Sequence, residues 1–180
     1  MHKSLASLLI LLFLSLYSRA QDVYYTRNAT LTINASIDGE IIHFKSDQLS
    51  ARLDYETAEI IMRMPINSLQ SGIDSLDRQL RRLHGEAVFD GKLGLEYINT
   101  DNHPPLNFDL EGWLILDLEK HLISGKGQLH HNANSSEYAC MLGLEMILNF
   151  EELNIHIPVE NLDAEFEIVV TQALLQRDKN

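Results

Sequence analysis

The sequence predicts an all-β protein made of antiparallel strands. Almost every stretch after residue 21 alternates apolar and polar residues, as at 31–35 and 106–111. A period of two places one face of a strand in an apolar interior and the other in water. Turn sequences such as Asp38-Gly39 leave little chain between strands, which favours antiparallel neighbours. Because a long open edge invites aggregation, we expect so many strands to close into a barrel or to pack as a sandwich.

The first strand is expected at 23–37, a stretch rich in Tyr, Thr and Ile. Three strands follow it in a meander with very short links. They are expected at 40–45, 48–55 and 59–66, with a turn at Ser46-Asp47. In the second half of the chain, alternation predicts strands at 92–99, 106–118, 122–130, 138–150 and 164–174. The total is eight to nine strands.

Residues 74–84 change to helical spacing, and Gly85 follows them as a typical helix stop. The apolar stripe of this segment consists of Leu76, Leu80 and Leu83. Its basic residues are Arg78, Arg81 and Arg82. We therefore expect one short helix over 74–84. The arginines could contact an anionic head group, or they could simply keep the helix surface soluble.

The first twenty residues are predicted to be a secretory signal peptide. Lys3 lies in a short basic start, residues 5–17 form an apolar run, and Ser18-Arg19-Ala20 offers small residues where a signal peptidase reads. The run is too short for a comfortable membrane span, with an uncleaved anchor as the alternative. We expect a signal peptide at 1–20, one domain at 21–180, and a secreted protein without an integral membrane span.

The charge and the cysteine count exclude several classes of protein. The formal net charge is −12, and loss of Lys3 and Arg19 with the signal would make it −14. A chain this acidic should repel nucleic acid and anionic membrane surfaces. We therefore expect any bound lipid to be held inside the protein. The single cysteine, Cys140, excludes an internal disulfide framework. It falls in a predicted strand, where a small buried filler is favoured over a reactive thiol.

The chain has eight histidines, but their spacing does not predict a metal site. His130 and His131 are adjacent, so on a strand they point to opposite faces. The others after the signal are scattered, at positions 43, 84, 103, 121 and 156. Nucleophile-elbow, phosphate-loop and dinucleotide motifs are also lacking. We expect surface or polar-network histidines, no metal, no cofactor and no enzymatic activity.

Three segments carry a resemblance to a known family. Residues 64–72 run into Asp77-Arg78-Gln79-Leu80, which is similar to a strand and short loop leading to a helix with an Asp-x-x-Leu motif. Residues 127–131 are similar to a strand led by Gly-x-Leu, and 146–158 lead to a closing strand at 164–170. In this order, the segments resemble the YceI-like family of polyisoprenoid-binding proteins. The stretch at 83–105 is drawn out relative to that family.

The resemblance implies an extended, eight-stranded, lipocalin-like antiparallel β-barrel that holds an isoprenoid tail for carriage, storage or sequestration in the periplasm. Such a tail binds by removing apolar area from water, at about 25 cal/mol per Å². The lining must therefore be apolar, and the apolar phase of the strands and two helix leucines supply it. The candidates are Leu31, Ile33, Phe44, Leu53, Ile60, Met62, Met64, Leu76, Leu80, Leu95, Phe108, Leu142, Leu144, Met146, Phe166 and Ile168.

Other interpretations stay open. Inward residues of a barrel form a core whether or not it is hollow, and an amphipathic helix that packs on a barrel explains Leu76 and Leu80 equally well. The alternative is a solid-core β-domain with an adhesion or structural role, and a homodimer is compatible with either. An enzyme would need polar groups clustered inside the barrel, and the apolar phase offers almost none.

Overall fold

The computed structural model describes residues 22–99, 103–131, 139–155 and 159–177. The predicted signal peptide and His156 lie outside them. The strands are β1 (Val23–Ile37), β2 (Glu40–Asp54), β3 (Glu59–Pro65), β4 (Glu86–Leu93), β5 (Leu106–Leu116), β6 (Glu119–His131), β7 (Cys140–Asn149) and β8 (Leu162–Arg177). Between β3 and β4 lie the 3-10 turn η2 (Ile66–Ser68) and the short α-helix α2 (Asp74–Leu80). Among the described residues, no helix is long and apolar enough to cross a membrane.

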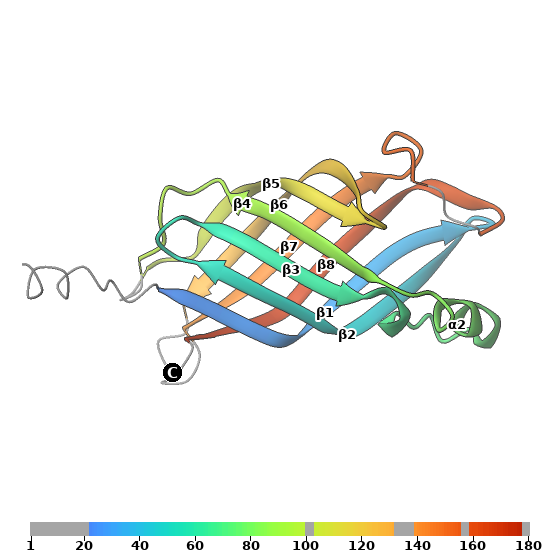
Figure 1. Ribbon diagram of the computed structural model, residues 1–180, viewed down its shortest axis with the longest axis horizontal. Coiled ribbons are helices and arrows are strands. Elements are labelled where there is room, and N and C mark those ends of the chain that lie inside the picture. The colour runs from blue at the N-terminus through green and yellow to red at the C-terminus, as the bar shows by residue number, and fades with distance from the viewer. Residues whose placement is uncertain (1–21, 100–102, 132–138, 156–158, 178–180) are drawn as a thin grey trace, which may run out of the picture.

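The strands form one closed barrel in sequence order, and every neighbouring pair is antiparallel. The barrel closes where β1 pairs with β8, for example at Ile33 and Ile168. Figure 1 shows an elongated barrel. The start of β1 and the end of β8 lie at one end, which we call the terminal end. The helix α2 and the connections β1–β2 and β7–β8 lie at the other, which we call the helix end. The predicted eight-stranded barrel with one short helix is thus confirmed.

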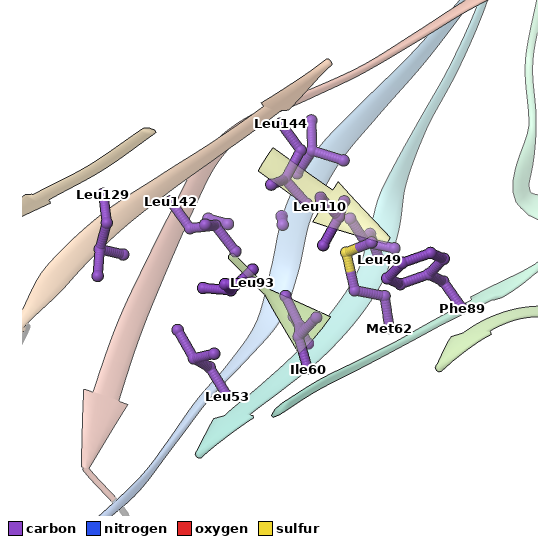
Figure 2. Packing of buried hydrophobic residues seen from close by; sticks show 14 of the residues in the cluster. Leu49, Leu53, Ile60, Met62, Phe89, Leu93, Leu110, Leu129, Leu142 and Leu144 are labelled. Carbon is purple, nitrogen blue, oxygen red and sulfur yellow. The ribbon is translucent and has the colours of Figure 1, made fainter. Parts of the chain in front are cut away.

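The period-two pattern explains which face of each strand is inside. Along β7, Cys140, Leu142, Leu144, Met146 and Leu148 are buried, while the residues between them are more exposed. The inward side chains of all eight strands join one apolar cluster. Figure 2 shows such side chains from several strands pointing toward the same interior. The core of the protein therefore lies inside the barrel.

The predicted turn at Ser46-Asp47 is wrong, because a single strand, β2, runs from Glu40 to Asp54. Its register with β1 shifts at this point, so that Ala29 pairs with Leu49 but Leu31 pairs with Ser46. The extra residue on β2 is a β-bulge. A local turn-like sequence thus marks a kink inside a continuous strand rather than a reversal.

The predicted strand at 92–99 is also wrong, since β4 covers Glu86–Leu93 and the next residues leave the sheet. The pairing partner β3 is only 7 residues long, and its first residue, Glu59, pairs with Lys92. Beyond that point the Leu93 amide still donates to the carbonyl of Ala58, but β3 offers no further residue to pair with the chain. Tyr97, which would point inward if the alternation continued from Leu95, is 67% exposed, and Ile98 is buried instead.

The helix is shorter than predicted and ends at Leu80 rather than at residue 84. The chain continues as a turn, in which the amide of Arg82 donates to the carbonyl of Gln79 and that of Leu83 to Leu80. No residue of α2 is buried, so tertiary packing does little to extend the helix. Gly85, which was expected to stop the helix, does adopt a positive φ of 106°. It lies beyond the end of α2, however, and directly precedes β4.

Candidate functional site

Most of the predicted lining residues meet inside the barrel. The buried ones in the central cluster are Leu31, Leu53, Ile60, Met62, Met64, Phe108, Leu142, Leu144, Met146 and Ile168. The partly buried ones packed against that cluster are Ile33, Phe44, Leu80, Leu95 and Phe166. Leu76 lies on α2 outside the cluster and is half-buried. The structure therefore places the apolar phase of the sequence at a common interior.

Glycines on β4, β5 and β6 shape this interior. A Cβ added at Gly91 would lie 2.5 Å from Cζ of Phe89, and one at Gly127 would lie 2.6 Å from Cζ of Phe108. The aromatic rings thus lie against the barrel wall at positions where the wall has no side chain. These glycines were not among the predicted site residues. The sequence did contain a signal for them, because a glycine inside a strand often marks a position where another group comes close to the backbone.

The terminal end of the barrel is tightly packed. The rings of Tyr24 and Tyr55 stack with centroids 4.0 Å apart, and both side chains are buried. Leu53, Leu129 and Leu175, all near this end, are 0% exposed. The segment after β4 also contributes here, because the amide of Ile98 donates to the carbonyl of Tyr55. Apolar side chains and stacked rings therefore close this end.

The helix end is more open. Ile33, Phe44 and Phe166 point inward by register, yet all three are only partly buried. Phe166 stacks against Phe150, which follows β7, with ring centroids 6.4 Å apart. The helix α2 lies at this end and buries none of its residues (Figure 1). Solvent therefore reaches apolar side chains of the interior from the helix end.

Two local contacts hold the segment that carries α2. The Ser68 hydroxyl of η2 lies 2.6 Å from that of Ser46 on β2, and both residues are buried. Next to this pair, Lys45 and Gln70 exchange two backbone hydrogen bonds. The base of the helical segment is thus fixed to the barrel.

Other hydrogen bonds lie within the segment itself. The Asp77 carboxylate of α2 accepts bonds from the amide and hydroxyl of Ser71, and these bonds lower its pKa.

The basic side chains of α2 and of the turn that follows it face solvent. Arg78, Arg81 and Arg82 are all exposed, and they lie at the helix end of an acidic protein. An exposed guanidinium can bind phosphate or carboxylate through two parallel hydrogen bonds. The more open end of the apolar interior thus has three guanidinium groups near it, together with exposed acids of the two connections at the same end, such as Asp38 and Glu151.

Two described grooves lie outside the barrel. One has a volume of about 670 Å³, and its exposed lining residues include Asn107, Lys126 and Glu145. The other has a volume of about 770 Å³ and includes Lys92 and Glu111. Strand alternation places these polar residues on the face opposite the core. The apolar interior, rather than either groove, is therefore the candidate site for an apolar ligand.

Comparison with known proteins supports the fold. No family model matches the sequence, and no curated protein matches it. The structure is similar to "a polyisoprenoid binding domain from Saccharophagus degradans implicated in plant cell wall breakdown", with a TM-score of 0.67 and 10% identity over 88% of this chain and 99% of that one. It is also similar to BcnA of Burkholderia cenocepacia, with a TM-score of 0.59 and 9% identity over 79% of this chain and 93% of that one. The protein thus has the fold of a polyisoprenoid-binding domain, which confirms the implied fold relationship.

Proposed function

We propose that this protein is secreted or periplasmic and that it binds one isoprenoid-type lipid, such as a prenyl lipid or a quinone, by its tail inside the barrel. The observation that carries the proposal is the unequal packing of the two ends. The terminal end is closed by fully buried leucines and the Tyr24–Tyr55 stack. At the helix end, Phe44 and Phe166 remain partly exposed. A tail would therefore enter from the helix end.

The chemistry of the interior suits such a ligand. The predicted lining consists of aliphatic, thioether and phenyl groups, so its contacts with a tail would be apolar. Each Å² of apolar surface removed from water contributes about 25 cal/mol, so a long tail gains affinity along its whole length. Met62, Met64 and Met146 suit a flexible tail because thioether side chains adapt their shape. The similarity to a polyisoprenoid-binding domain adds support for a lipid of this class.

The experiment is native mass spectrometry of the purified, undenatured protein, followed by uptake of a fluorescent prenyl probe. We expect co-purified lipid, or saturable uptake of one probe per chain. The test variant is Phe166→Glu, which puts a charge at the helix end. Its control is Ile147→Glu on the neighbouring strand, because Ile147 is 60% exposed on the outer face and pairs with Glu167 next to Phe166.

Phe166→Glu should reduce probe uptake by at least about tenfold, since a buried charge in the path of the tail costs more than 1.4 kcal/mol. Ile147→Glu should leave uptake unchanged. Circular dichroism and a thermal unfolding curve must show that both variants are folded. A wild-type protein without lipid that also takes up no probe would contradict the proposal, as would equal loss in both variants.

A solid-core β-domain with a structural or adhesion role is the second candidate. The contiguous cluster of side chains that are at most 9% exposed favours it. In that case the thermal midpoint of the wild-type protein should not change when prenyl or quinone probes are added. A lipid-binding protein should instead be stabilised as the probe concentration rises above its Kd.

A further inference from the structure

Three side chains that can bind a metal meet at the terminal end of the barrel, away from the proposed entrance for lipid. His103 precedes β5, His131 ends β6 and Cys140 begins β7. His131 and Cys140 are paired in the β6–β7 register, and their ring nitrogen Nδ1 and sulfur Sγ lie 4.0 Å apart. Nε2 of His103 lies 3.3 Å from the same sulfur. One ligand atom from each residue falls within 4.8 Å of the other two.

The sulfur–nitrogen distances in this cluster are close to the distances between ligand atoms around a bound ion. With Zn–S of about 2.3 Å and Zn–N of about 2.0 Å, tetrahedral angles hold sulfur and nitrogen about 3.5 Å apart. The two observed sulfur–nitrogen distances, 3.3 and 4.0 Å, lie on either side of this value. The two imidazole nitrogens lie within 4.8 Å of each other, against about 3.3 Å around a tetrahedral ion, so rotation of an imidazole ring would bring the three atoms around one ion.

The backbone also prepares His103 as a ligand. Its Nδ1 lies 2.8 Å from the carbonyl oxygen of Pro104, which can only accept a hydrogen bond. The ring proton therefore lies on Nδ1, and Nε2 presents its lone pair toward Cys140. Metal-binding histidines typically donate their second ring N–H to a carbonyl or a carboxylate in this way. His103 is buried, so the arrangement is held by packing as well.

A buried tyrosine packs beside the cluster. Tyr55 is 1% exposed, and its hydroxyl lies next to the Cys140 side chain. Its ring stacks on that of Tyr24, so the three candidate ligands lie among packed side chains at the closed end.

We propose that His103, His131 and Cys140 bind one thiophilic d¹⁰ metal ion, Zn²⁺ or Cu⁺. Imidazole and thiolate are the ligands that these ions share. On binding, the metal–sulfur bond replaces the S–H bond of Cys140, and the proton leaves to solvent. The ion would tie the start of β5 to the β6–β7 pair at the closed end.

The experiment uses the purified full chain, stripped with a chelator and freed of any affinity tag. Co²⁺ is titrated first, because a cobalt–thiolate bond gives a charge-transfer absorption that Zn²⁺ lacks. Zn²⁺ is then added to displace it. A parallel titration uses Cu⁺ under reducing, oxygen-free conditions. The chain has a single cysteine, so a thiolate band in the wild-type protein reports Cys140 whether or not any variant folds.

Variants then test individual ligands. His131→Gln should weaken Zn²⁺ binding at least about 100-fold, beyond the tenfold to hundredfold that is typical for loss of a second-shell partner. Cys140→Ser should abolish the thiolate band. The matched control is His130→Gln, because His130 is adjacent on β6 but points to the other face, toward Gln128. It should bind like the wild type.

Binding of one equivalent with a thiolate band, lost in the two test variants and kept in the control, supports the site. The relative affinities for Zn²⁺ and Cu⁺ then name the ion. A folded wild-type protein that shows no thiolate band with Co²⁺ and no saturable binding of Cu⁺ overturns the proposal. Equal binding by folded His131→Gln overturns it as well. Neither result depends on whether the barrel holds a lipid.

Discussion

Phe108 and Gly127 face each other across the β5–β6 pair, and the ring of Phe108 occupies the space that a side chain at position 127 would need. A Cβ there would lie 2.6 Å from both Cζ of Phe108 and Cδ2 of Leu144. The absence of a side chain on one strand is therefore what allows a large side chain on the next to lie along the wall.

Gly127→Ala should destabilise the barrel by about 1–3 kcal/mol, the usual cost of overpacking a core. The control is Gly143→Ala on the adjacent strand β7, where the nearest atom to an added Cβ is 3.8 Å away. Urea unfolding of both variants measures the difference. Equal stability of the two alanine variants would show that Phe108 moves aside without cost.

The two shortest hairpins differ at one position, and this difference predicts opposite effects of substitution. Gly39 in the β1–β2 turn and Leu118 in the β5–β6 turn both have positive φ, at 80° and 72°. Leu118 is 95% exposed, so packing does not repay its left-handed conformation. Leu118→Gly should raise the free energy of unfolding by about 0.5–1 kcal/mol, and Gly39→Leu should lower it by about 1–2 kcal/mol. Thermal unfolding of both variants tests the prediction, and a destabilising Leu118→Gly would contradict it.

The buried hydroxyl pair under η2 predicts a specific loss. Ser46→Ala removes the partner of Ser68 and also the acceptor of the Gln48 amide, whose distance to Ser46 Oγ is 3.1 Å. The expected loss of stability is about 0.5–1.5 kcal/mol, the usual net value of a hydrogen bond, because the Ser68 hydroxyl still donates to the Pro65 carbonyl at 2.6 Å. Ser50→Ala on the same strand is the control, because its hydroxyl bond to the Arg63 carbonyl is exposed and longer, at 3.3 Å. Hydrogen exchange should show faster opening of residues 66–80 in Ser46→Ala alone.

Asp77 gives α2 a dependence on acid. Hydrogen bonds from Ser71 hold the pKa of Asp77 below its ordinary value of 3.8. The stabilisation that these bonds give is fully present above that ordinary value, and it is lost as the pH falls through the lowered pKa of the folded state. An NMR titration should place the Asp77 pKa below 3.8, and Ser71→Ala should move it upward. A pKa that is unchanged by Ser71→Ala would contradict the assigned cause.

The arginines of α2 and of the turn after it predict a preference between ligands. If a head group lies at the helix end, replacing Arg78, Arg81 and Arg82 with Gln should weaken binding of a prenyl diphosphate by at least about tenfold, through loss of charge-assisted hydrogen bonds. Binding of an uncharged quinone with a similar tail should be unchanged. Fluorescence competition measures both affinities. Equal weakening for the two ligands would show that the helix acts through packing instead.

Which residues of a strand face the interior could be predicted from the sequence, because a period of two is a local property of the chain. Leu142, Leu144 and Met146 lie inside for this reason. Register and continuity depend on partners that the local pattern does not show. Ser46-Asp47 resembled a turn because the partner strand that makes it a bulge is distant in the sequence. Residues 94–99 resembled a strand although β3 is too short to pair with them.

The histidines show the same limit more sharply. His103 and Cys140 are 37 positions apart, and only the closing of the barrel brings their side chains together. The sequence indicated correctly that the two adjacent histidines could not share one ion. It could not indicate that one of them, His131, lies beside Cys140, because that contact follows from the pairing of β6 with β7. Sequence-spacing rules for metal sites apply to ligands on one helix or strand. The three residues of this cluster come instead from β6, β7 and the segment before β5.

The pairing of β1 with β8 has a consequence for how the chain is made. Asp22 and Arg177, which are joined by a salt bridge, are 155 positions apart, so the seam joins the first strand of the barrel to be synthesised to the last. Until synthesis reaches β8, both β1 and β7 have unpaired backbone groups on one side. A growing barrel, or a fragment cut before residue 162, would remain an open sheet that is prone to self-association.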